Sequence, residues 1–346
     1  MEQALPLKIN IGGFNTGHIQ GIALDAERKY LYHSFTTCLV KTDLHGNIIG
    51  SVTGLAGHLG CIAYNPDDRK VYGSLEFKHD SIGSSILAKI GRSDDVWDGF
   101  YIVSFDVDKI DRPNMDAEKD GIMTAVFLKE VYNDFIAEGH RYGCSGIDGV
   151  TFAPAFGENG GKSYLYVAYG IYGDLSRSDN DHQIILKYDI SHWDRYAAPL
   201  DQTSMHRLGP DAPDAKYFLY TGNTTYGIQN LEYDPFSDTV LAAVYCGKKP
   251  QFPNYSLFFI DRTAAPERAE LFGIGQIGQR LSLAALGEKD SVSGICGSRF
   301  PYGATGMISL GDGRFYFSED FCDENGYGSN ICLYSFDKAT AEFKKL

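Results

Sequence analysis

Two histidines stand at equivalent places in two similar stretches of the sequence, HIQGIALD from His18 and HLGCIAYN from His58. Each imidazole lies three residues before an apolar strand-like segment, and Asp148 immediately precedes a third segment of the same kind. Imidazole and carboxylate groups are ligands for Zn²⁺ and Mn²⁺, and oxygen ligands also suit Ca²⁺. We therefore predict that His18, His58 and Asp148 bind a Ca²⁺, Mn²⁺ or Zn²⁺ ion. Two alternatives stay open: metal-free contacts to a substrate, and histidines that bond only to backbone groups.

Three glutamates are candidates for acid–base catalysis. Glu76 and Glu319 each lie where an apolar segment meets a loop, and partial burial there would raise a carboxyl pKa into the catalytic range. Two such groups across a pocket hydrolyse glycosidic bonds. Glu232 stands in the middle of the apolar segment LEYD, so it is either a buried, hydrogen-bonded carboxylate or a group that reaches the site. The alternative for the first two is a solvated surface position.

Further polar and aromatic residues are expected to contact a substrate. Glutamines directly before two of the segments offer hydrogen bonds, tyrosines offer rings for sugar stacking, and arginines in a long loop would clamp a carboxylate or phosphate. These residues are Gln20, Gln229, Tyr169, Tyr245, Arg280 and Arg299. The alternatives are tyrosines that fill the packing between repeated units and arginines that anchor the loop through an acidic neighbour.

A pattern that occurs five times must position these residues. A small residue opens an apolar strand, a polar turn follows, and an aromatic-rich strand comes next, which are the signals of a β-hairpin. The copies begin at Gly21, Cys61, Gly149, Asn230 and Gly306. A third strand then ends in aspartate, at Asp43, Asp106, Asp189, Asp261 and Asp337. A fourth strand is expected near Ser51, Leu128, Leu219, Leu271 and the C-terminal EFKKL.

Four-stranded antiparallel units repeated every ~40 to 90 residues are typical of β-propeller blades. We predict an all-β protein in which residues 1–346 form a single domain, a β-propeller of five four-stranded blades. The strand around residues 7–11 is expected beside the last blade, where it joins the chain ends and protects an open edge. Two alternatives stay open: a sixth, degenerate blade between Asp106 and Gly149, and a β-sandwich.

The first copy, from Gly21 to Tyr32, opens with Gly-Ile-Ala-Leu-Asp. In this the chain resembles the β-propeller superfamily, especially the six-bladed SMP-30/gluconolactonase and NHL-type proteins, whose blades often begin with such a strand. The resemblance covers the whole chain and concerns its architecture. It implies a cation at the channel mouth, as in propeller lyases and hydrolases, and a gluconolactonase-like activity would hydrolyse lactones with calcium or zinc at the axis. Several five-bladed propellers are glycosidases, which is a precedent at the level of fold.

Long connections are expected on one face of this propeller. Loops between the second and third strands lie on the same face as loops between blades, and both kinds are long here, whereas first-to-second connections are short. They are 78–99, 171–182, 247–254 and 322–329 within blades, and 132–147, 223–228 and 274–305 between blades. Because compact folds keep loops short unless the loops carry a function, we expect a ligand or partner site at this mouth. The alternative is that the loops only plug the channel.

The composition excludes several classes of partner. With 31 Lys and Arg against 45 Asp and Glu, the net charge of -14 disfavours nucleic acids and anionic membranes. No apolar stretch approaches the ~20 residues of a membrane span. MEQALPLKINIGG has no signal-peptide pattern, and the seven cysteines are scattered, so we predict reduced thiols in the cytoplasm. The alternative is an exported protein whose leader has been removed, with one or two disulfides.

The sequence contains no GxSxG, HExxH, P-loop or Cys–His signature, which argues against those hydrolase and nucleotide-binding classes. We predict a metal-assisted hydrolase or lyase that acts on a small polar substrate, a saccharide or sugar acid, at the channel mouth. The alternative is a non-catalytic propeller that binds a glycan, a peptide or a protein.

Overall fold

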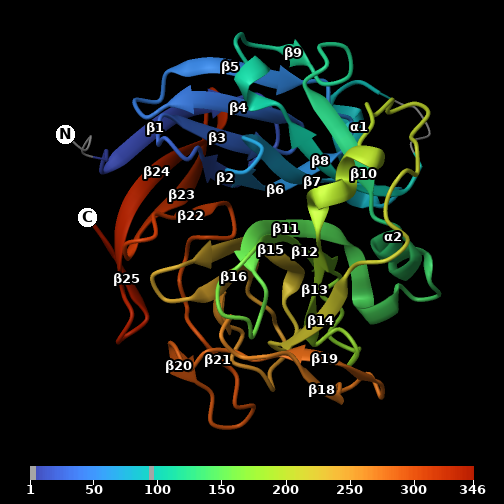
Figure 1. Cartoon of the computed structure of the whole chain (residues 1–346), viewed down its shortest axis with the longest axis vertical. Coiled ribbons are helices and arrows are strands. Elements are labelled where there is room, and N and C mark those ends of the chain that lie inside the picture. The colour runs from blue at the N-terminus through green and yellow to red at the C-terminus, as the bar shows by residue number, and fades with distance from the viewer. Residues whose placement is uncertain (1–4, 93–96) are drawn as a thin grey trace.

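In the computed structural model, which describes residues 5–92 and 97–346, five β-sheets stand around a central axis as the blades of a propeller (Figure 1). The innermost strand of each blade is one of the five predicted opening strands, and neighbouring inner strands contact each other around the ring. The inner strands are β2 (Ile19–Leu24), β6 (His58–Asn65), β11 (Cys144–Pro154), β15 (Thr225–Asp234) and β22 (Met307–Ser309). The prediction of an all-β, five-bladed propeller is confirmed, and the β-sandwich alternative is wrong.

The blades continue outward through antiparallel strands that follow one another along the chain. Blade 1 adds β3 (Tyr30–Phe35), β4 (Cys38–Asp43) and β5 (Ile48–Thr53), and blade 2 adds β7 (Lys70–Phe77), β8 (Gly99–Phe105) and β10 (Met123–Phe127). Blade 3 adds β12 (Ser163–Ile171), β13 (His182–Tyr188) and β14 (Ala215–Tyr220), and blade 4 adds β16 (Thr239–Tyr245) and β17 (Leu257–Asp261). Blade 5 adds β23 (Arg314–Asp323), β24 (Gly326–Asp337) and β25 (Glu342–Lys345).

Side chains of the inner strands alternate between the two neighbouring blades. On β2, Ile22 packs into a hydrophobic cluster with residues of blade 5, whereas Ala23 packs into a cluster with residues of blade 2. Both faces of the strand are therefore buried. A strand that is buried on both faces has an apolar sequence without polar alternation, which explains the continuous apolar runs of the repeat.

The N-terminal strand closes the ring. Strand β1 (Lys8–Phe14) pairs antiparallel with β24 and places Ile9 opposite Ile331, while β25 pairs with the remaining length of β24. The outer edge of blade 5 is thus covered by both ends of the described chain, which lie on the same side of the molecule (Figure 1). The predicted place of the N-terminal strand is confirmed.

The aspartate that ends the third strand of each blade has a structural role in most blades. Its Oδ1 accepts backbone N–H groups from the following turn: from His45 and Asn47 at Asp43, and from Thr263 at Asp261. In the same way, Asp189 accepts the backbone N–H of Ser191, and Asp337 accepts that of Ala339. Such Asx turns fix the entry into the next segment, so this repeated aspartate is explained without any role in a site.

Blade 4 departs from the predicted pattern. The segment expected as its fourth strand forms β18 (Glu267–Glu270), which pairs with β19 (Ile277–Leu281), and β19 adds parallel to β14 of blade 3. Beside β17, Ser298 and Leu283 instead form isolated antiparallel β-bridges with Leu257 and Ile260. Three of the four residues of β18 are exposed, so this segment has too little apolar surface to cover the buried strand β17. The prediction of a fourth strand near Leu271 is therefore wrong.

Other connections also differ from expectation. The segment between Asp106 and Gly149 forms the short strand β9 (Met115–Asp116) on β5, then β10, then helix α2 (Lys129–Ile136) against β11 and β8, so it adds no sixth blade. Residues 322–329 continue the β23–β24 hairpin rather than forming an inserted loop. Within 274–305, β19 and the two-stranded sheet of β20 (Glu288–Lys289) and β21 (Cys296–Gly297) lie at the periphery (Figure 1).

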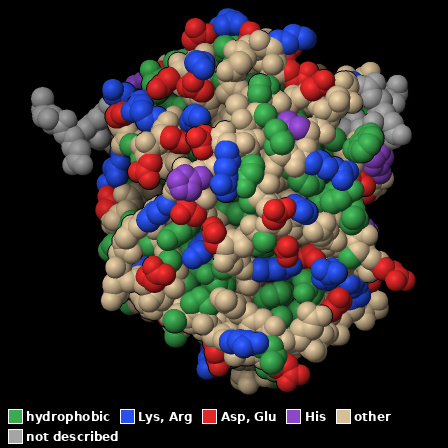
Figure 2. All heavy atoms as spheres, turned by 45° about the vertical axis from the view of Figure 1, so that its right-hand side comes forward, with side chains coloured by type: hydrophobic (Ala, Val, Ile, Leu, Met, Phe, Trp, Pro, Cys, Tyr) green, Lys and Arg blue, Asp and Glu red, His purple; other side chains and the backbone are tan. Residues whose placement is uncertain are grey.

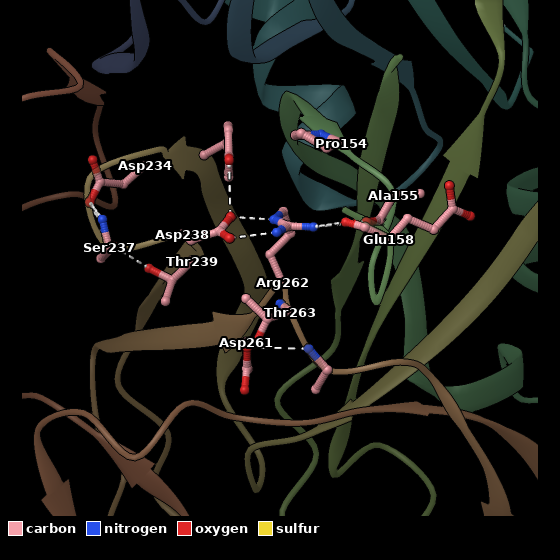
Figure 3. A network of polar contacts seen from close by, with 12 residues as sticks. Pro154, Ala155, Glu158, Asp234, Ser237, Asp238, Thr239, Asp261, Arg262 and Thr263 are labelled. Atoms are coloured by element: carbon pink, nitrogen blue, oxygen red, sulfur yellow. Dashed lines mark hydrogen bonds and ion pairs between the residues drawn. The ribbon is translucent and has the colours of Figure 1, made fainter. Parts of the chain in front are cut away.

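A polar network joins blades 3 and 4 away from the long loops (Figure 3). The Arg262 guanidinium, which is buried, pairs with Asp238 through two nitrogens and donates to the carbonyls of Ala155 at 3.3 Å and Glu158 at 2.5 Å. Asp238 also accepts from the hydroxyl of Tyr233 at 3.0 Å. The turn that follows β11 is thereby tied to the hairpin of blade 4.

The molecular surface is mixed in charge. Figure 2 shows acidic and basic side chains interspersed over one face, so the negative net charge is not concentrated there. Within residues 5–92 and 97–346, no helix is long and apolar enough to cross a membrane. All seven cysteines are free thiols, of which Cys38, Cys61, Cys144 and Cys332 are buried.

Candidate functional site

A pocket of about 270 Å³ lies at the end of the axis where the second-to-third connections of the blades meet. Four of the five blades contribute residues to it, together with the start of helix α1 (Ser81–Lys89). It brings together seven residues that the sequence pattern singled out: His18, Gln20, His58, Glu76, Asp148, Gln229 and Tyr245. We refer to it as the axial pocket.

Glu76 is buried in the wall of the axial pocket and forms an ion pair. Its Oε1 lies 2.5 Å from the Lys78 Nζ, and its Oε2 accepts the backbone N–H of Ile147 at 3.0 Å. Burial raises the pKa of Glu76, and the Lys78 ammonium offsets only part of this effect. Burial opposes the charge of Lys78 as well, but Glu76 and Asp80 outweigh it and raise the Lys78 pKa. Lys78, which sequence reasoning missed, also donates to the carbonyl of Ser145 at 2.9 Å.

Asp148 is the most strongly perturbed carboxyl group of the pocket. It is buried, and its Oδ1 has no hydrogen-bond partner. Burial, followed by the nearby Glu76 carboxylate, raises the pKa of Asp148 well above its ordinary value. One pocket thus contains an ion-paired glutamate and an unpaired aspartate with a strongly raised pKa, and environments that differ in this way separate the roles of base and acid.

Two glycines make room for these carboxyl groups. A Cβ atom at Gly60 would overlap with Asp148 Oδ1, and a Cβ atom at Gly146 would overlap with Glu76 Oε2. Gly146 also has a φ of +130°, which side chains rarely adopt. Both carboxyl positions therefore depend on the absence of a side chain in the adjoining strand.

The two histidines are neutral hydrogen-bonding groups. Burial lowers the pKa of His58 to about 3, and Lys78 adds to this shift. Burial also lowers the pKa of His18, against the opposing effect of Asp320. The Gln20 amide donates to His18 Nε2 at 3.1 Å, whereas His58 Nδ1 has no hydrogen-bond partner and lies 3.7 Å from Glu76 Oε1.

Three tyrosines give the pocket an aromatic wall: Tyr172, Tyr226 and Tyr245. The ring of Tyr226 stands edge-on to that of Tyr245, with 6.2 Å between centroids. Tyr226 has a φ of +64°, a conformation that costs a bulky residue about 1–3 kcal/mol and that clusters at ligand sites. Tyr172 donates to Asp80 at 3.3 Å, and Asp80 caps α1 by accepting the N–H groups of Ile82 and Gly83. The helix and the aromatic wall thus hold each other in place.

Two residues predicted for the site lie buried elsewhere. Tyr169 is buried against α2 and donates to Asp134 at 3.0 Å. Glu232 accepts the N–H of Ser309 at 2.7 Å, between the inner strands of blades 4 and 5, and burial raises its pKa to about 8. It is thus a hydrogen-bonded carboxylate packed between blades, the first of its two interpretations.

Glu319, Arg280 and Arg299 are also outside the axial pocket. Glu319 accepts from Tyr334 and Lys345, each at 2.6 Å, and although burial opposes its charge these partners lower its pKa. Arg280 pairs with Glu267 across β18 and β19. Arg299 pairs with Glu288 at 2.8 Å and borders a neighbouring cavity.

The predicted metal ligands share the pocket without forming a ligand cluster. Among the residues that the structure describes, no group of three or more His, Cys, Asp or Glu side chains is arranged to hold a metal ion. A Ca²⁺, Mn²⁺ or Zn²⁺ ion at His18, His58 and Asp148 stays a prediction, and the side chains as they stand do not fit it.

Comparisons with known proteins assign no family. No protein-family model and no curated protein matches the chain. Among solved structures, a protein of unknown function from Desulfotomaculum acetoxidans is similar at 11% identity and a TM-score of 0.40, covering 100% of this chain and 77% of that one. The Dos1 propeller is similar at 11% identity and a TM-score of 0.36, and the match covers 94% of this chain and 56% of that one. The SMP-30/gluconolactonase and NHL resemblance is not confirmed.

Proposed function

We propose that the axial pocket binds a small, neutral saccharide and that the protein acts on it as a hydrolase or lyase. The observation that carries this proposal is the pair of carboxyl groups in one aromatic-walled pocket, Asp148 buried with a strongly raised pKa and Glu76 held in an ion pair. Tyrosine rings offer stacking surfaces, and the amide of Gln229 and the two neutral histidines offer hydrogen bonds. This combination suits hydroxyl-rich molecules.

The charges favour a neutral sugar over a sugar acid. Lys78 is the cation of the pocket, and it is already paired with Glu76 at 2.5 Å and with Asp80 at 3.6 Å. A carboxylate on the ligand would therefore meet no free positive charge from Lys78 and would be repelled by Asp80.

In a hydrolytic reaction Asp148 would donate its proton to the leaving oxygen, and Glu76 would accept a proton from the attacking water. In a lyase reaction Glu76 would instead accept the proton from carbon. The Lys78 ammonium favours the charged form of Glu76 and offsets part of the effect of burial, and the recess at Gly146 makes room for its carboxyl group. No step of this scheme requires a metal ion.

A second candidate function is ligand binding without catalysis, and the contacts of Glu76 favour it. Both of its oxygens are engaged, one by Lys78 and one by the Ile147 N–H. Glu76 must therefore give up one of these partners before it can act as a base. Under this alternative the pocket selects a saccharide and releases it unchanged.

The two candidates are separated by measuring turnover and affinity on the same proteins. Nitrophenyl glycosides and simple lactones are tested for turnover, and the corresponding free sugars for binding by calorimetry, with wild type, Asp148→Asn and Glu76→Gln. If the protein is an enzyme, the turnover of Asp148→Asn should be at least ~100-fold lower than that of wild type, and its affinity for the sugar should stay within a few-fold of wild type. Binding without turnover supports the second candidate. No binding of any neutral sugar would refute both.

A further inference from the structure

A second cavity, of about 420 Å³, opens beside the axial pocket between blades 4 and 5. It is bordered by the end of β16, by residues 299–305 and by Asp320 on β23. Tyr245 lines both cavities, so this residue belongs to the wall of each.

The electrostatic surroundings of Tyr245 agree with this position. Burial raises its pKa, followed by the charges of Asp148, from the axial pocket, and Asp320, from the second cavity. The charge of Asp320 also opposes the lowering of the pKa of His18, which belongs to the axial pocket. The polar groups of the two cavities are therefore within electrostatic reach of one another across Tyr245.

The second cavity repeats the chemistry of the first. It presents the aromatic side chains of Phe300 and Tyr302, the carboxylate of Asp320 and the carboxamide of Asn254, whose buried Oδ1 has no hydrogen-bond partner. Its cation, Arg299, is already paired with Glu288 at 2.8 Å. A cavity with aromatic walls, polar groups and no unpaired cation suits a second neutral sugar unit better than a charged group.

The dimensions point in the same direction. Small-molecule sites enclose about 300–1,000 Å³, and the axial pocket alone falls just below this range, whereas the two cavities together fall within it. From the shared wall and the repeated chemistry we infer that the ligand is an oligosaccharide of at least two units, one in the axial pocket and the next in the second cavity beyond Tyr245. This inference rests on the proposed saccharide site.

An exposed thiol makes the inference testable without knowledge of the reaction. Cys246 lines the second cavity and is exposed, and Cys322, which is also exposed, is outside both cavities and serves as an internal reference. The rates of alkylation of both thiols by N-ethylmaleimide are measured by peptide mass spectrometry. The probes are neutral gluco-, xylo- and galacto-configured sugars of one to four units, in α- and β-linked series.

An oligosaccharide that binds is expected to slow alkylation of Cys246 at least tenfold and to leave Cys322 unchanged, whereas the corresponding monosaccharide slows neither. Calorimetry on the same series is expected to show at least tenfold tighter binding of the disaccharide or trisaccharide than of the monosaccharide. Tyr302→Ala should abolish this gain with length, and Tyr302→Phe, which keeps the ring, should preserve it.

Equal affinity for one and several units, with Cys246 unprotected, would overturn the inference and leave the proposed saccharide site standing. A gain with length that survives in a folded Tyr302→Ala protein would also overturn it, because the extra unit would then lie elsewhere. If no sugar of any length binds, the proposed function fails, and the inference fails with it.

Discussion

Whether a side chain lies in the site depends on the face of the strand to which it points, as two neighbouring residues of blade 5 show. Glu319 and Asp320 are adjacent on β23, but alternation along a strand directs them to opposite faces. Glu319 meets Tyr334 and Lys345, whereas Asp320 borders the second cavity. The sequence pattern places both residues near the mouth. They differ only in the face of β23 to which each side chain points.

The same reason explains which tyrosines could be predicted. Tyr245 ends β16 and Tyr169 lies near the end of β12, the second strands of their blades, yet only Tyr245 reaches the pocket. Register shifts interrupt the pairing of each strand with its inner neighbour, between Ile147 and Val150 in blade 3 and between Thr225 and Ile228 in blade 4. A shift of one residue moves a side chain to the other face, and neither shift is evident from composition.

Glu232 gives a prediction about stability and pH. Its pKa is raised from 4.5 to about 8 in the folded protein, so between these values the folded state binds more protons than the unfolded state. The free energy of unfolding should therefore fall as pH rises through this window, by the contribution of this group. Glu232→Gln, which keeps an acceptor for the Ser309 N–H, should flatten the dependence when unfolding by urea is measured at several pH values.

The control for this experiment is Glu319→Gln. Its partners lower the pKa of Glu319 in the folded state, so this group stabilises the fold above its unfolded pKa, and the contribution is lost as pH falls. The two substitutions should thus alter opposite ends of the pH profile. An unchanged slope between pH 4.5 and 8 in Glu232→Gln would show that Glu232 is not perturbed as described.

At the scale of elements, contacts between blades hold loops in place, and Arg262 is the clearest case (Figure 3). Arg262→Ala would leave Asp238 without its ion pair and two carbonyls of the turn after β11 without a donor. We expect a loss of about 2 kcal/mol or more, less than for a fully buried pair because Asp238 is a third exposed. Urea unfolding measures the loss.

Arg280→Ala provides a matched control, since Arg280 forms a single pair with Glu267, which is 64% exposed. Exposed pairs contribute about 0–1 kcal/mol, so this variant should stay close to wild type. Equal losses in the two arginine variants would contradict the structural role given to Arg262.

The elements themselves were predictable where burial is uniform. All five inner strands and all five third strands could be predicted, because a strand enclosed between two blades must be apolar along its length. The fourth strands lie at the outer edge, where the pattern is weaker, so the polar segment Glu267–Glu270 joins blade 3 instead. Helix α2 replaces the end of the strand expected near Leu128 for the same reason.

At the scale of the whole molecule, ring closure creates the site. His18, His58 and Asp148 are far apart in the chain and meet because inner strands converge at the axis: His18 directly precedes β2, His58 begins β6 and Asp148 lies within β11. This convergence was predictable from the aligned repeats. Lys78 could not be predicted, because its place in the site follows from a buried ion pair with Glu76.

The central claim is that convergence of the blades buries Asp148 beside the Glu76–Lys78 ion pair and raises the pKa of its carboxyl group well above the ordinary value. The most direct measurement is the titration of the Asp148 carboxyl carbon by ¹³C NMR in protein labelled at aspartate, with the signal assigned by its absence in Asp148→Asn. We expect the Asp148 carboxyl group to titrate well above the ordinary aspartate value. A signal that titrates near the ordinary aspartate value of about 3.9 would contradict the account, because Asp148 would then be a charged group without the proton it is proposed to donate.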